Sequence, residues 1–169
     1  NSILHYVVMI GLFIADGWST EAYQGRRTSF VALDYIAGKY NSSEPRYLEI
    51  LLTHETVHSH HYQCNASTWR EYHIGEALFL EGFAVLVSSK ALPGATEAEY
   101  LWFNPGYEAW FKTCERQWFE IQQHLLEDFD ATDSERYAAY FQLFGKSQLP
   151  LRSGYFAGYR LVSTLNQQY

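Results

Sequence analysis

The hydrophobic pattern of this 169-residue chain changes its period near Pro45, and this change constrains the fold more than any other feature. Before it, residues 6–13 and 28–33 are rich in Val, Ile, Phe and Thr and are separated by turn-forming glycines, which predicts a small sheet. After it, apolar and histidine side chains recur at helical spacing, which predicts a helix over about residues 46–61. The chain therefore switches from strands to helices about a quarter of the way along.

Further helical patterns follow in the rest of the chain. We expect helices over about residues 71–89 and 150–167, with a long amphipathic stretch over 105–127 between them. The expected class is α+β, with a small N-terminal β-sheet followed by a mostly helical body. At this length, one compact domain over residues 1–169 is expected.

Composition excludes several classes of function. The 12 basic and 19 acidic residues give a net charge of −7, which disfavours nucleic-acid binding. The apolar run over residues 6–15 is about half the length of a membrane span and predicts a buried strand.

Cys64 and Cys114 permit one disulfide without requiring it. The chain begins with Asn1, which indicates a processed form or fragment of a longer protein, and both cytoplasmic and exported locations are consistent with that.

The sequence His54-Glu55-Thr56-Val57-His58 lies on the helix expected over 46–61. Spacing of four residues places both imidazoles on one face of a helix, where they can bind a single zinc ion. Zinc lowers the pKa of a bound water to near 7, and Glu55 is placed to accept its proton as general base. Because a buried helix does not carry such polar residues without partners, the motif predicts a zinc site for hydrolysis.

A third protein ligand is expected on the helix over 71–89, where Glu76 and Glu81 are the candidates. A catalytic zinc has three protein ligands and keeps one position for water. Glu81 has apolar neighbours and is expected to face the packed side, whereas Glu76 lies where the helix dipole favours a carboxylate without a metal. We therefore expect Glu81 to be the third ligand. His61 lies about 10.5 Å along the helix from His54, too far to share an ion with it.

The last helix offers donors that could complete the site. Gly154 and Gly158 are expected to clear one face for close packing, and Tyr155 and Tyr159 lie together beside it. A phenol can donate a hydrogen bond to a developing oxyanion, and Arg160 could do the same. Tyr155 is the first candidate, although tyrosines at such positions are as often core residues.

Residues 54–58, followed by Glu81-Gly82 on the next expected helix, resemble the gluzincin metallopeptidases. A more specific resemblance rests on three segments, residues 54–58, 81–84 (E-G-F-A) and 154–159 (G-Y-F-A-G-Y). The match is closer to a bacterial family of predicted zinc-dependent proteases that shares all three segments. The resemblance implies a single zincin-like metallopeptidase domain over residues 1–169, with His54, His58 and Glu81 as ligands and Glu55 as base. The chain departs from many gluzincins at Val85, where they carry an acidic residue that orients a histidine, and it lacks the G-A-M-E-N signature of the large aminopeptidases.

The sequence thus predicts a zinc-dependent metallopeptidase that acts on a peptide or protein substrate. Two alternatives use the same residues. One is a non-catalytic zinc-stabilised binding or scaffold domain, which would require a fourth ligand such as His61 or His73. The other is a zinc hydrolase of non-peptide amides. The sequence does not indicate an oligomeric state.

Overall fold

A computed structural model describes residues 4–12, 15–39, 46–65, 70–102, 107–142 and 147–168. The chain divides into two compact units. The first comprises residues 1–68 with 87–95, and the second comprises residues 69–86 with 96–169. In chain order, a three-stranded sheet comes first and the described helices follow it, so the expected α+β class is confirmed.

The sheet in the first unit has the strand order β1-β3-β2. β1 (His5–Met9) pairs in parallel with β3 (Arg26–Ala32), and β2 (Gly17–Tyr23) pairs with β3 in antiparallel fashion. Gln24 and Gly25 join β2 to β3 with φ angles of 52° and 74°, as in a type I′ hairpin turn. β2 is not predicted by the sequence, because the polar residues of this strand do not form a strong strand pattern.

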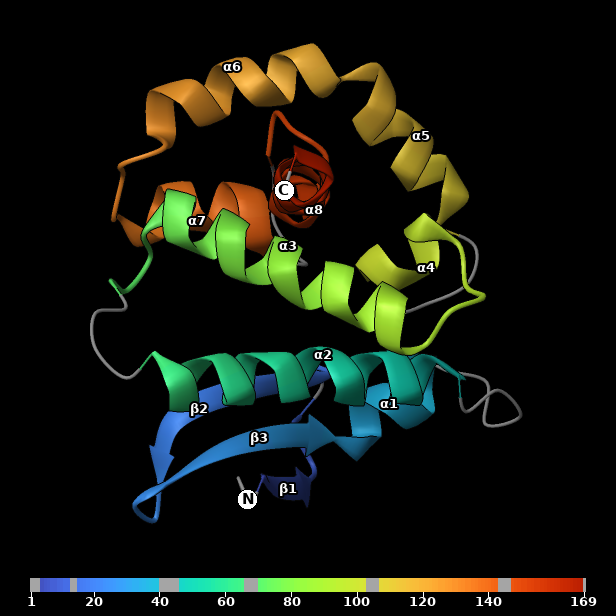
Figure 1. Cartoon of the computed structure of the whole chain (residues 1–169), viewed down its shortest axis with the longest axis vertical. Coiled ribbons are helices and arrows are strands. Elements are labelled where there is room, and N and C mark those ends of the chain that lie inside the picture. The colour runs from blue at the N-terminus through green and yellow to red at the C-terminus, as the bar shows by residue number, and fades with distance from the viewer. Residues whose placement is uncertain are drawn as a thin grey trace. The chain divides into compact units, whose positions relative to one another are not determined.

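Helix α2 (Arg46–Cys64) packs on β2 and β3, as Figure 1 shows. A short helix, α1 (Leu33–Lys39), leads from the sheet toward it. Ile50 and Leu51 have no exposed surface, and they form the core of this unit with the inner residues of β3. The helix expected over 46–61 is confirmed and continues to Cys64, while Pro45 lies outside the described residues.

The expectation of a buried strand over residues 6–15 is wrong. The strand ends at Met9, and Val8, Ile10 and Leu12 are 57%, 69% and 76% exposed. β1 lies at the edge of the sheet, and α2 packs against the other two strands, so most apolar side chains of this run have no covering layer. Residues 13 and 14 lie outside the described part of the chain.

The second unit is helical. Its elements are α3 (Ile74–Ala91, whose last residues belong to the first unit), α4 (Glu97–Trp102), α5 (Glu108–Arg116), α6 (Trp118–Asp128), α7 (Ser134–Phe141) and α8 (Ser153–Gln168). α3 confirms the helix expected over residues 71–89, and α8 confirms the helix expected over 150–167. The stretch expected over 105–127 forms two helices, because the chain bends at Gln117; residues 105 and 106 lie outside the described part.

Helix α8 is the centre of this unit and contacts α5, α6 and α7, which surround it in Figure 1. It also crosses α3 at two glycines. A Cβ atom added to Gly82 would lie 2.2 Å from the carbonyl group of Gly158, so the two backbones touch. Phe156 is fully buried nearby. The expected packing role of Gly158 is confirmed. Within the described ranges, no helix is both long and apolar enough to span a bilayer.

Candidate metal centre

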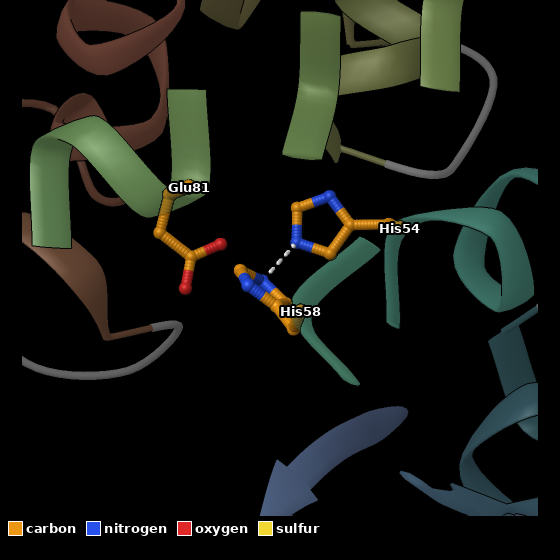
Figure 2. Close-up of side chains that lie close together, drawn as sticks. All are labelled: His54, His58 and Glu81. Carbon is orange, nitrogen blue, oxygen red and sulfur yellow. Dashed lines mark hydrogen bonds between the residues drawn. The ribbon is translucent and has the colours of Figure 1, made fainter. Parts of the chain in front are cut away.

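Two histidines on one turn of α2 point their ring nitrogens at each other. The Nε2 atoms of His54 and His58 lie 2.9 Å apart, joined by the dashed line in Figure 2. The ring planes are inclined by 79°, with centroids 4.6 Å apart. Both side chains are buried, at 2% and 7% exposure. Because a helix repeats every 3.6 residues, the spacing of four residues produces this convergence.

Glu81 on α3 extends its carboxylate toward the two histidines in Figure 2. The ligand atoms offered by His54, His58 and Glu81 all lie within 4.8 Å of one another, so this group could hold a metal ion. Two imidazoles and one carboxylate form a donor set that zinc accepts, as in thermolysin and carboxypeptidase A. By its donor chemistry the group therefore fits the metal that the sequence predicts.

Glu76, the other candidate ligand, is bound elsewhere. Its carboxylate accepts hydrogen bonds from the backbone N–H of Arg70 at 2.9 Å and from the Nε of Arg70 at 2.5 Å. Burial alone would raise the pKa of Glu76, but the hydrogen bonds and charge of Arg70 lower it overall. His73, at the start of α3, accepts a hydrogen bond from the Glu76 backbone N–H at 3.1 Å. Glu76 thus belongs to the N-terminal turn of its helix.

Glu55 contacts the sheet of the first unit. It is 5% exposed, and its Oε2 accepts a hydrogen bond from the hydroxyl of Ser19 on β2 at 2.8 Å. Sequence reasoning missed Ser19 because it missed β2. The turn Gln24-Gly25 pairs Tyr23 with Arg26 and by itself would place Ser19 opposite Phe30. A register shift between Thr20 and Tyr23 places Ser19 opposite Ser29 instead, and the sequence carries no signal for that shift.

The remaining residues at the end of α2 lie outside the metal-ligand group. His61 is half-buried, and burial lowers its pKa, as do the nearby charges of His58 and His60. His60 is exposed, with its Nε2 3.7 Å from the Sγ of Cys64. Cys64 is exposed and Cys114 is buried, and both are free thiols.

The three oxyanion candidates of α8 have different surroundings. Tyr159 donates a hydrogen bond to Glu97 at 3.2 Å, and Arg160 pairs with Glu115 at 3.0 Å. Burial raises the pKa of Tyr159, and the Glu97 carboxylate raises it further. Tyr155 is half-buried, and the guanidinium of Arg152 lies 3.9 Å from the centre of its ring.

Comparison with known protein families gives a match over most of the chain. Residues 8–169 match the model of a protein family described as predicted Zn-dependent protease (DUF2268). The chain belongs to this family. No curated protein matches the chain, and no solved structure matches it. Zinc dependence and proteolysis in this family are themselves predictions, and the metal-ligand group described above agrees with the first of them.

Proposed function

We propose that this member of the predicted zinc-dependent proteases hydrolyses peptide bonds, with zinc held by His54, His58 and Glu81 and with Glu55 as general base. The observation that carries the proposal is the approach of two buried imidazole nitrogens to 2.9 Å beside a carboxylate. Three protein ligands are typical of a catalytic zinc, whereas a structural zinc is closed by four.

The proposed roles of the side chains follow from their chemistry. Zinc, when bound, supplies Lewis acidity and lowers the pKa of water at the site. Glu55 accepts a proton from the attacking water while the oxygen of that water forms a bond to the carbonyl carbon of the substrate peptide. Glu55 then gives this proton to the leaving amine as the C–N bond breaks. Tyr155 is the proposed hydrogen-bond donor to the oxyanion that forms in between.

The test compares two substitutions that make the same chemical change on the same helix. Glu55→Gln removes the proposed base, whereas Glu49→Gln changes an exposed residue six positions earlier. We expect Glu55→Gln to lower the hydrolysis of a mixed fluorogenic peptide library by about 100-fold or more and Glu49→Gln to leave it unchanged. Elemental analysis should give about one zinc per chain in both variants.

Two results would contradict the proposal. Hydrolysis by Glu55→Gln at the wild-type rate would show that Glu55 is not the base. Bound zinc in a wild-type protein that cleaves no member of the library would favour a zinc that only stabilises the fold.

A further inference from the structure

Three serine hydroxyls form a chain of short contacts that ends on the Glu55 carboxylate. Ser19 on β2 lies 2.8 Å from the Oε2 of Glu55, Ser29 on β3 lies 2.9 Å from Ser19, and Ser59 on α2 lies 2.7 Å from Ser29. Ser29 and Ser59 are 1% and 3% exposed. All four residues belong to the first compact unit.

The Glu55 carboxylate determines which hydroxyl donates in each of these hydrogen bonds. An ionised carboxylate only accepts hydrogen bonds, and each hydroxyl has a single proton. Ser19 therefore donates to Glu55, and its oxygen can accept from Ser29, which can accept from Ser59. The backbone carbonyl of Glu55 lies farther from Ser19 and Ser29, at 3.3 and 3.2 Å. Hydrogen bonds that point in one direction strengthen one another in a buried environment.

The same strand also lies close to the aliphatic part of Glu55. Gly17 lies on the same face of β2 as Ser19, two residues earlier, and a Cβ atom added there would be 3.4 Å from the Cγ of Glu55. The last torsion angle of a glutamate has a broad energy minimum, so packing of the stem alone leaves the carboxylate plane free to rotate. The hydrogen bond from Ser19 to Oε2 opposes that rotation.

We propose that Ser19 is a positioning residue, which orients the Glu55 carboxylate for proton transfer. This inference rests on the proposed function, because it assigns Ser19 a role in the same reaction. Ser19 acts through Glu55 and needs no contact with the substrate.

The experiment compares three variants of the full chain. Ser19→Ala removes the hydroxyl, and Ser19→Thr retains it on a residue type that strands favour. Ser59→Ala is the matched control, because it removes a buried hydroxyl from the same chain without touching the carboxylate. Crystal structures give the orientation of Glu55 in each, elemental analysis gives the zinc content, and the peptide library gives kcat and KM.

We expect the Glu55 carboxylate to rotate away from its wild-type orientation in Ser19→Ala and to keep it in Ser19→Thr and Ser59→Ala. In Ser19→Ala, kcat should fall about tenfold with KM and zinc content unchanged, the size of one hydrogen bond to a charged group. Ser19→Thr should recover most of this loss, and Ser59→Ala should lower kcat less than about threefold.

An unchanged carboxylate in Ser19→Ala would overturn the inference, as would an equal loss of kcat in Ser59→Ala. If the wild-type protein cleaves no peptide, the proposed function fails instead. The crystal structures then still decide whether Ser19 orients Glu55, so the two failures can be told apart.

Discussion

The backbone of Gly82 in α3 rests directly on the backbone of Gly158 in α8. A Cβ atom on Gly158 would lie 2.2 Å from the carbonyl oxygen of Leu78, and one on Gly82 would lie 2.2 Å from the carbonyl of Gly158. Both positions therefore require glycine for steric reasons. Glu81, the proposed third ligand, is the residue next to this crossing, so the distance between the two helices also fixes the place of its backbone.

Substitution at this crossing should be costly. We expect Gly82→Ala to lower the free energy of unfolding by at least about 2 kcal/mol, because the added methyl group meets backbone that cannot rotate away. Gly154→Ala is the comparison, since the atoms nearest to its methyl group would be those of the Phe141 ring, at 2.5 Å and beyond, and not backbone. Urea unfolding should show the smaller loss for Gly154→Ala, and equal losses would mean that the two helices can separate without cost.

Zinc should stabilise the fold through His58. We expect addition of EDTA to lower the melting temperature of the wild-type protein, since a ligand at 1,000 times its Kd contributes about 4 kcal/mol. His58→Ala should melt at the same temperature with and without EDTA. His60→Ala is the control, because this exposed histidine lies outside the ligand group and its loss should leave the EDTA effect intact. Loss of the effect in His60→Ala would contradict the assignment of ligands.

The two thiols should react very differently. Burial raises the pKa of Cys114 from 9.0 to about 12, while Cys64 is exposed. Iodoacetamide at pH 8 should therefore modify Cys64 in the native protein and both residues in urea, as mass spectrometry of tryptic peptides would show. Modification of both thiols at equal rates in the native protein would contradict the burial of Cys114.

The same thiol makes stability depend on pH in the alkaline range. The unfolded chain loses the Cys114 proton from about pH 9, whereas the folded chain keeps it until about pH 12. The folded state therefore binds more protons in this window, and the contribution of Cys114 to stability falls as the pH rises. Cys114→Ser, compared with the wild type between pH 8 and pH 10.5, should show a weaker decline in the free energy of unfolding.

The hairpin between β2 and β3 offers a stabilising substitution. Gln24 has a φ angle of 52°, which asparagine tolerates better, and Asn-Gly is a preferred type I′ turn. We expect Gln24→Asn to raise the free energy of unfolding by about 0.5 kcal/mol. Gly25→Ala should lower it by about 1 kcal/mol through backbone strain alone, because an added Cβ would meet no atom within 4 Å. Thermal unfolding measures both, and a destabilising Gln24→Asn would contradict the assigned turn.

Sequence reasoning identified the parts of the fold whose signals are local. The convergence of His54 and His58 is predictable because they lie only four positions apart on one helix. The close packing of the last helix is predictable from the glycines that recur on one of its faces. The burial of residues 6–15 could not be predicted in this way. It depends on which strand lies at the sheet edge and which strands α2 covers, and both are set by pairing between distant segments.

The environment of the proposed base likewise depends on contacts between segments that are distant in the sequence. Glu55 was predictable from its neighbours in the chain, but Ser19, Ser29 and Ser59 come into contact only where two strands and a helix meet. An isolated serine in a sequence of this length carries no such information. Likewise, the sequence did not predict that Arg70 binds the carboxylate of Glu76, which the hydrogen bonds between them show.

The placement of both histidines on one turn of α2 also has a consequence for the order of events in biosynthesis. The ribosome completes α2 before it begins α3, so the two imidazoles are available before Glu81 has been made. A growing chain can then hold a metal ion by two ligands on a single helix, and the third ligand arrives only with the next helix. On the proposed ligand set, secure retention of zinc would therefore mark the completion of α3.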